Sequence, residues 1–249
     1  MKMHFLRHAT FILTVGEKRL LFDPMLSTTG AMPPVPDVAN KSANPLVPLP
    51  ITTALETVDA LVVTHNHRDH FDEAAAELLP HDLPLFCQPA DREGFAQRGF
   101  IQVRAVDNYM DWEGLKLYRT GGQHGTGKIG QKMGPVSGFV VKTETGPAIY
   151  VAGDTIYCPE VEAAIEEYHP AVIICFAGAA RFSKGDPITM SREDVGRVCA
   201  KAPDATIVAV HMEAWNHCTL TRRELADYLK VTASGSRVLI PADGEQLDL

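Results

Sequence analysis

Apolar and polar positions follow one another in a way that predicts strands early in the chain and strand–helix repeats later. Two apolar runs within residues 11–23 flank the polar stretch Gly16 to Arg19 and predict a β-hairpin. Short continuous apolar runs predict buried strands, whereas apolar positions that recur every three to four residues predict helices. The further strands are expected at residues 60–65, 83–89, 114–120, 138–144, 147–154, 171–178, 206–211 and 237–243. The helices are expected at residues 71–79, 91–99, 159–169, 191–202 and 221–231.

The order of these elements predicts two sheets flanked by helices. No break in composition marks a linker, so residues 1–249 are expected to form a single domain. Residues 25–51 differ from the rest because they hold six prolines, which exclude a helix or a central strand. These are Pro33, Pro34, Pro36, Pro45, Pro48 and Pro50. So long a loop in a compact domain is usually a functional lid or disordered, and this one could cover a site or mediate a subunit contact.

Composition and charge narrow the class of protein. With 249 residues, 45% of them apolar, the chain can bury a full-sized core. It carries 23 basic against 31 acidic residues and no run of Lys or Arg, which argues against nucleic acid as the main partner. No apolar stretch approaches the roughly 20 residues that cross a bilayer, and no signal-peptide cleavage pattern is present. We therefore expect a cytoplasmic protein without a membrane partner.

Cysteine usage argues against a disulfide framework and against a cysteine-built zinc site, because no C-x-x-C pair occurs. The five cysteines are expected to be buried apolar fillers: Cys87, Cys158, Cys175, Cys199 and Cys218.

Histidines are concentrated at the end of one predicted strand. The segment HNHRDH holds His65, His67, Asp69 and His70. If the ten histidines were evenly spaced, a segment of six residues would contain fewer than one histidine. Imidazole nitrogens and carboxylate oxygens bind Zn²⁺ and similar metals. The alternative is a polar surface loop.

Three more residues of these ligand types follow predicted strands further along the chain. They are His124 in GGQHGTG, Asp154 in VAGDT and His211 in VAVHMEAW. Separately, His124 could be a turn residue, Asp154 a helix N-cap and His211 a strand-end histidine. If the strand ends share one edge, however, these three residues meet the cluster. Five histidines and two aspartates are enough to bind two metals and leave positions for water.

The chain resembles the metallo-β-lactamase superfamily. THNHRDH resembles its H-x-H-x-D-H signature, and His124, Asp154 and His211 occur in the order of its later ligands. HATFILTVGEKRLLFDP, the GDT at residues 153–155 and DPITMSREDV resemble a subgroup with ascorbate-phosphate lactonases and uncharacterised metal-dependent hydrolases. The resemblance implies an α/β (α+β) fold, a four-layer αββα sandwich of two mixed β-sheets flanked by helices, over nearly the whole chain.

The resemblance also implies a dinuclear hydrolase. His65, His67 and His124 would hold the first metal; Asp69, His70 and His211 would hold the second; and Asp154 would bridge both. The implied catalyst is a metal-bridging hydroxide that attacks a small-molecule lactone, ester, amide or phosphoester, with a lactone as the first expectation and Asp69 orienting the hydroxide. The ligands suit Zn²⁺ best, and Mn²⁺ or Fe²⁺ are the alternatives.

Several nearby residues have both a functional and a structural interpretation. His8, in RHAT, lies where the subgroup usually has Gly-His-Ala, and it either serves the site or packs in the core. Asp23 either accepts a ring N–H from a metal-bound histidine or forms an Asp-Pro turn. His217 is a candidate catalytic donor to an oxyanion or leaving group, or else a helix-start or surface histidine. Cys218 beside it is not expected to be a nucleophile.

Loop cations offer a further hint of substrate chemistry. Four of them could rim the site and attract an anionic substrate, although solvated charges are the default: Lys128, Lys132, Arg181 and Lys184.

Other functions of the same superfamily fit the sequence less well. An iron-dependent oxidoreductase or dioxygenase is the first alternative, but its diiron members usually carry an acidic residue where this chain has His67. A phosphodiesterase or nuclease ranks lower because the acidic chain offers no basic docking surface. A purely structural metal needs only four ligands. The expected partner is a small-molecule substrate, and general frequency alone suggests a homo-oligomer.

Overall fold

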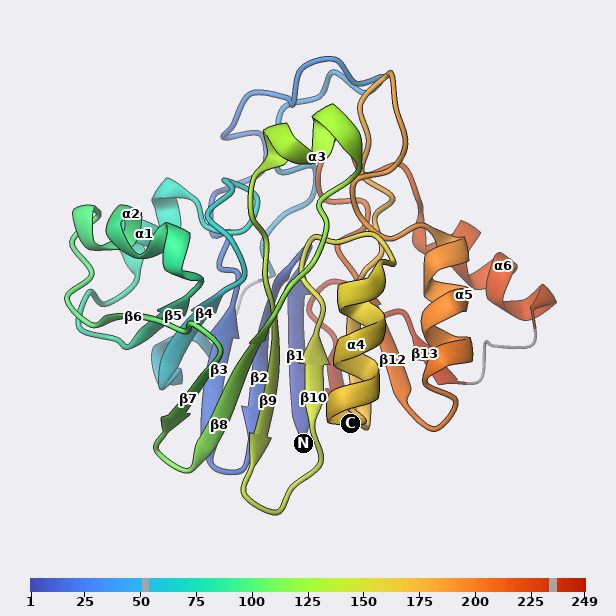
Figure 1. The fold of residues 1–249 in the computed structure, drawn as a ribbon. Helices are drawn as coiled ribbons and strands as arrows, with labels where there is room; N and C mark the ends of the chain where they lie inside the picture. Colours follow the sequence, from blue (N-terminus) through green and yellow to red (C-terminus); the bar gives the residue numbers. More distant parts are fainter. Residues whose placement is uncertain (51–53, 233–236) are drawn as a thin grey trace.

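Two seven-stranded sheets lie face to face in the computed structural model, which describes residues 1–50, 54–232 and 237–249 (Figure 1). The first sheet has the order β14-β1-β2-β3-β4-β5-β6. Its strands are β1 (Lys2–Arg7), β2 (Thr10–Val15), β3 (Lys18–Phe22), β4 (Ala60–Val63), β5 (Leu85–Cys87), β6 (Val103–Ala105) and β14 (Gln246–Asp248). The pairs from β14 to β3 are antiparallel and those from β3 to β6 are parallel, so the sheet is mixed.

The second sheet has the order β13-β12-β11-β10-β9-β8-β7 and is also mixed. Its strands are β7 (Tyr109–Trp112), β8 (Leu115–Thr120), β9 (Gly138–Thr143), β10 (Ile149–Val151), β11 (Val172–Phe176), β12 (Thr206–Val210) and β13 (Val238–Leu239). Strands β7 to β10 pair antiparallel, whereas β10 to β13 pair parallel. In this sheet each connection between parallel strands contains a helix, as is usual for crossovers.

Helices cover the outer faces of both sheets. They are α1 (Glu73–Leu78), α2 (Arg92–Gln97), α4 (Pro159–Tyr168), α5 (Arg192–Lys201) and α6 (Arg222–Val231). Helix α3 (Gly127–Met133) lies instead among the loops at one end of the sandwich (Figure 1), and the short 3₁₀ turns are η1 (Ala54–Thr57) and η2 (Pro89–Asp91). Helices α1 and α2 lie beside β4 to β6, whereas α4, α5 and α6 lie beside β10 to β13 (Figure 1). The predicted four-layer αββα fold is confirmed.

Alternation along each strand divides the buried residues among three cores. In β11, Val172, Ile174 and Phe176 enter the core between the two sheets. Ile173 and Cys175 point the other way, into the core under α4 to α6. Because side chains alternate across a strand and both faces are covered, the strand is apolar at every position.

Most predicted elements are confirmed with shifted ends, and several elements escaped prediction. The structure adds β1, β6, β7, β14 and α3, whose patterns are short or rich in polar residues. The N-cap of α4 is Cys158, so Asp154 is not the helix cap that its position before PEVEAAIEEY allowed. Predicted strand 237–243 shortens to the two residues of β13. Residues 25–50 contain no helix or strand, only an isolated bridge between Met32 and Asn44, and residue 51 lies outside the described residues.

Candidate metal centre

The candidate centre forms where strands of both sheets end. His8 follows β1, Asp23 follows β3 and His65 follows β4 in the first sheet. Asp154 and His211 come just after β10 and β12 in the second sheet. Because these strands run in the same direction, their carboxyl ends meet at one end of the sandwich, the end that carries the long loops in Figure 1. Residues as distant in the chain as His8 and His211 thus reach one place.

Asp154 lies at the middle of the cluster. Its Oδ2 is 3.3 Å from His70 Nε2, 3.5 Å from His124 Nε2 and 4.0 Å from His65 Nε2. Its Oδ1 is 3.1 Å from His211 Nε2 but makes no hydrogen bond with the described residues. A buried carboxylate surrounded by four imidazoles has the position expected of a ligand shared by two metals.

The other donors divide into two groups on either side of Asp154. The ring nitrogens of His65, His67 and His124 form one group, and within it His65 Nε2 lies 2.9 Å from His67 Nδ1. Asp69, His70 and His211 form the other, with both Nε2 atoms 3.8 Å from Asp69 Oδ2. All donor atoms of a group lie within 4.8 Å of one another. Metal–ligand bonds of 2.0–2.2 Å put tetrahedral donors roughly 3.4 Å apart, so each group fits one divalent ion.

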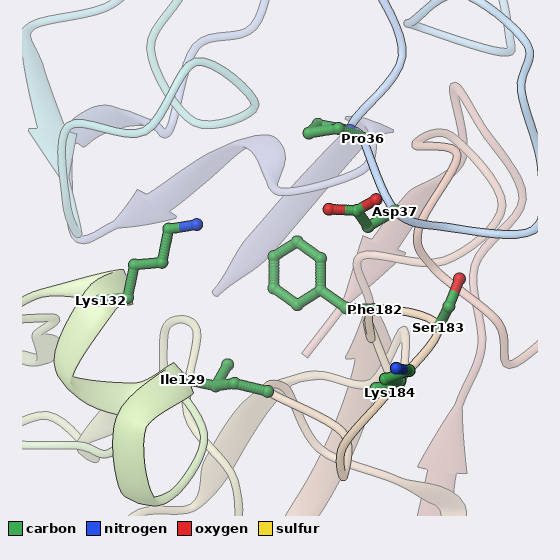
Figure 2. Close-up of a pocket in the computed structure, with 7 residues that line it drawn as sticks. All are labelled: Pro36, Asp37, Ile129, Lys132, Phe182, Ser183 and Lys184. Carbon is green, nitrogen blue, oxygen red and sulfur yellow. The ribbon is translucent and has the colours of Figure 1, made fainter.

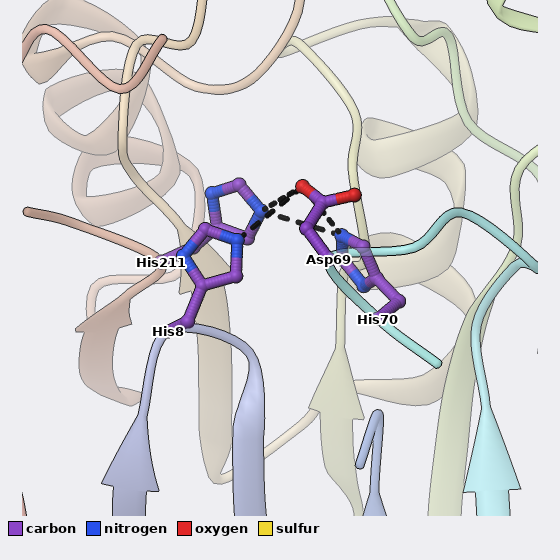
Figure 3. A group of neighbouring side chains, drawn as sticks. All are labelled: His8, Asp69, His70 and His211. Atoms are coloured by element: carbon purple, nitrogen blue, oxygen red, sulfur yellow. Dashed lines mark hydrogen bonds and ion pairs between the residues drawn. The ribbon is translucent and has the colours of Figure 1, made fainter. Parts of the chain in front are cut away.

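His8 joins the second group, beyond what the sequence assigned to it. Its Nε2 lies 3.3 Å from Asp69 Oδ2, and its ring is 3.7 Å from that of His211, centre to centre (Figure 3). Trp215 stacks near the same ring at 5.9 Å. The side chain is fully buried, so it belongs to the interior of the centre and not to a separate core.

Partners on the far side of the rings fix which nitrogen faces inward. His124 Nδ1 donates to the carbonyl of Ile188 at 2.8 Å, and His70 Nδ1 donates to Asp23 Oδ2 at 2.9 Å. His65 Nδ1 lies 3.1 Å from Thr64 Oγ1, which itself donates to Asp23 Oδ2 at 2.8 Å. Each bond occupies Nδ1 and leaves Nε2 turned toward Asp154, as metal-binding histidines require.

Burial and mutual charge set the protonation of the cluster. Burial holds the pKa of His65 well below its usual value, reinforced by the charges of His70 and His67. Burial also lowers the pKa of His70, but the carboxylates of Asp154, Asp23 and Asp69 outweigh it and leave that pKa well above the ordinary one. Burial would raise the pKa of Asp154, yet His211 and His70 hold it well below its usual range. The carboxylates of Asp69 and Asp154 are therefore ionised and attract cations.

The backbone is strained at residues in and directly beside the centre. His8, Asp23 and His211 have φ values of +56°, +41° and +67°, in the left-handed region that residues other than Gly seldom occupy. Gly153, just before Asp154, has φ +72°, and a Cβ there would lie 2.5 Å from the carbonyl oxygen of Ser137. Such strain costs of order 1 kcal/mol or more per residue and is typical of functional sites.

A cavity of about 460 Å³ opens above the centre. Asp69, His67 and His124 lie at its base, with Arg68 and His217 beside them. Most of its remaining lining is apolar and consists of Val35, Pro36, Met133, Phe182 and Trp215. Asn66 and Lys132 add polar groups. The cavity has the size and mixed lining of a small-molecule site.

The Pro-rich segment 25–50 supplies one wall of this cavity and is held in place by buried polar side chains. Arg7 donates to the carbonyls of Val47, Met25 and Ser27. Asn216 bonds the segment from the opposite side. Arg7, which stands where the resembling subgroup has Gly, thus has a structural role in anchoring the loop.

His217 is buried at 5% exposure, which corrects the interpretation as a surface or helix-start histidine. Burial lowers its pKa to about 4, so the imidazole is neutral near pH 7. Its Nδ1 makes no hydrogen bond with the described residues. Cys218 lies 3.7 Å from His211 Nδ1 through its Sγ, and burial raises the pKa of this thiol well above its usual value. A protonated thiol is a poor nucleophile, as expected.

The four loop cations that could rim the site differ in where they lie. Lys132 lines the cavity above the centre, and Lys184 lines a second cavity beside it. Arg181 lines another surface hollow instead and donates to the carbonyl of Gly185. Lys128 lines none of the cavities described here.

The fold and this His/Asp centre define a metallo-β-lactamase-type protein. The pattern of the Beta-lactamase superfamily domain matches residues 18–212, so the chain belongs to that superfamily. It is 38% identical to the UPF0173 protein YddR of Bacillus subtilis over 96% of both chains, which places it in the UPF0173 family.

Two solved structures are similar over essentially the whole chain. A possible metal-dependent hydrolase from Veillonella parvula shares 34% identity with a TM-score of 0.97, covering 100% of this chain and 99% of that one. An isothiocyanate hydrolase from Delia radicum gut bacteria shares 34% identity with a TM-score of 0.94 and the same coverage. In the described part of the chain, no helix is long and apolar enough to cross a membrane.

Proposed function

We propose that this protein is a metal-dependent hydrolase of small molecules with an electrophilic carbon, using two divalent metals, with Zn²⁺ the best fit. The observation that carries the proposal is the inward-facing set of ring nitrogens around Asp154, at the base of the cavity. In this arrangement His65, His67 and His124 would hold one metal and Asp69, His70 and His211 the other. Family membership and the similar hydrolases support the same function.

Bound metals would lower the pKa of a coordinated water and polarise the group under attack. The chain's own residues supply orientation and proton handling. Asp69 Oδ2 is aimed at the centre and held by His8, so it can orient a nucleophilic water. The neutral imidazole of His217 lines the cavity and can donate a hydrogen bond to the atom that gains negative charge.

Isothiocyanates are the substrate class that we propose first. The isothiocyanate hydrolase at 34% identity supports this choice, and the chemistry suits the site. Water adds its oxygen to the central carbon of R–N=C=S, and the resulting thiocarbamic acid loses its C–N bond to give R–NH₂ and O=C=S. The nitrogen leaves with both added protons, so no oxidant or co-reactant is needed. Lactones, predicted from the sequence resemblance alone, are the second series to test.

The test is turnover by metal-loaded protein of known metal content. We expect about two equivalents of metal per chain and release of primary amine from isothiocyanates. His67→Ala and Asp69→Ala should each lower kcat/KM at least about 100-fold with unchanged circular dichroism, because each removes a proposed ligand.

His169→Asn is the matched control. His169 is exposed at the end of α4 and has φ +43°, a conformation that Asn tolerates. The substitution should therefore leave the rate unchanged. Full turnover by His67→Ala, or no turnover of either substrate series by the two-metal wild type, would overturn the proposal.

A further inference from the structure

A second cavity of about 430 Å³ adjoins the one above the metal centre. Pro36, Lys132 and Phe182 line both cavities. Figure 2 shows the Phe182 ring between the Pro36–Asp37 segment and the side chains of α3. The two cavities therefore form an inner compartment over the centre and an outer compartment. None of the proposed metal ligands or catalytic residues lines the outer compartment.

Three segments distant in the sequence build the outer cavity and are tied to one another. The amide of Ser183 donates to the carbonyl of Asp37 at 2.6 Å, which joins the loop after β11 to the Pro-rich segment. Ile129 of α3 packs on Gly185 so closely that a Cβ there would lie 2.6 Å from Ile129 Cδ1. These contacts hold the cavity walls in position without any ligand.

The lining has the chemistry of a site for an apolar group. Pro36, Ile129 and Phe182 offer apolar surface, of which Ile129 and Phe182 are only half-buried. Lys132 and Lys184 add two positive charges against the single negative charge of Asp37, and neither lysine forms an ion pair with the described residues. A cationic group is therefore disfavoured there.

We propose that the outer cavity is the binding subsite for an elongated apolar arm of the substrate, whose reactive end lies over the metal centre. The inference rests on the proposed hydrolase function and adds the substrate class: isothiocyanates with a long, uncharged or anionic arm. Each methylene that enters the cavity loses contact with water, which is worth about threefold to fourfold in kcat/KM until the cavity is filled.

The experiment compares methyl, propyl and hexyl isothiocyanate with metal-loaded wild type, corrected for the rate without enzyme. We expect kcat/KM to rise at least tenfold from methyl to hexyl, and to fall when the hexyl arm ends in a trimethylammonium group. Ser183→Trp fills the outer cavity from an exposed position and should bring the hexyl-to-methyl ratio close to one. Gln131→Trp, exposed on α3 but outside both cavities, is the matched control and should keep the wild-type ratio.

A second readout does not depend on catalysis. Calorimetry with N-hexylurea and N-methylurea on metal-free protein should show tighter binding of the hexyl compound, and Ser183→Trp should abolish the difference. Turnover with equal rates for all arms, or a ratio that Ser183→Trp leaves unchanged, would overturn the subsite while the hydrolase function stands. If no isothiocyanate is hydrolysed, the proposed substrate class fails, and the urea titrations alone decide whether the subsite exists.

Discussion

At the scale of single residues, Asp23 shows how one buried carboxylate can organise a centre that it does not enter. Its oxygens accept hydrogen bonds from the backbone and hydroxyl of Thr64 and from His70 Nδ1. Burial raises its pKa, while His70 and the bonds from Thr64 act in the opposite direction. Through these contacts it fixes the orientation of His70 directly and that of His65 through Thr64.

His217 gives a pH prediction at the same scale. Because burial lowers its folded-state pKa to about 4 from 6.5, the unfolded chain binds a proton between these values and the folded chain does not. The free energy of unfolding should therefore fall as the pH drops below about 6.5. His217 alone should contribute about 2 to 3 kcal/mol of that loss by pH 4.5.

Urea denaturation of chelated protein at pH 7 and pH 4.5 measures this loss. Gln cannot titrate, so the free energy of unfolding of His217→Gln should fall less over that range than that of the wild type. The difference should be about 2 to 3 kcal/mol. The His169→Asn variant should behave like the wild type, since His169 is exposed. An equal loss in His217→Gln and wild type would contradict the prediction.

At the scale of elements, the Pro-rich segment 25–50 is a fixed wall and not a free loop. The Asn216 side chain uses its full bonding capacity on it: Oδ1 accepts from Val35 and Asn44, and Nδ2 donates to the carbonyls of Val35 and Asn40. Asp72 adds bonds to the backbone of Leu26 and Ser27 while capping α1. Prolines prevent regular structure here, so side chains replace the missing backbone pairing.

Asn216→Ala should therefore loosen this segment. Removing the side-chain amide leaves Asn44 and several backbone groups unpaired, which costs about 2 to 3 kcal/mol. We expect faster amide hydrogen exchange within residues 27–46 and little change in the sheets. Asn108→Ala, at an exposed position, is the control. Wild-type exchange rates in residues 27–46 of Asn216→Ala would show that the segment is held by other contacts.

At the scale of the whole molecule, the centre joins the two sheets. Five of its donors come from loops that follow β1 and β4 in the first sheet, and three come from loops that follow β8, β10 and β12 in the second. A metal bound by donors of both sheets would link the two layers and stabilise the folded state over the unfolded one.

Metal removal should therefore lower the thermal midpoint of the protein. At a free metal concentration 100 times Kd, binding contributes about 2.7 kcal/mol, or roughly 5 to 10 °C for a chain of this size. Scanning calorimetry with and without chelator measures the shift. The shift should be smaller in His67→Ala than in the wild type and unchanged in His169→Asn. A midpoint that does not respond to chelator in the wild type would exclude a metal that links the sheets.

The sequence by itself determined the fold class and brought the main donors to notice. Buried segments such as 171–178 and 207–210 are apolar at every position, and the donors of HNHRDH lie within six residues, so both signals are local. Strand order then implied that His124, Asp154 and His211 meet them. For Asp23 and His8 the sequence left two interpretations open: a role at the centre, or a purely structural role.

Only the tertiary structure decided the features that depend on distant segments. β1 exists because β2 and β14 pair with it from both sides, although β14 is more than 230 residues away. The burial of His217, the position of His8 beside Asp69 and the outer cavity at Phe182 result from contacts between loops whose own patterns predict no structure. Local patterns report which face of an element is buried, whereas the partners that a loop residue meets depend on how whole layers pack.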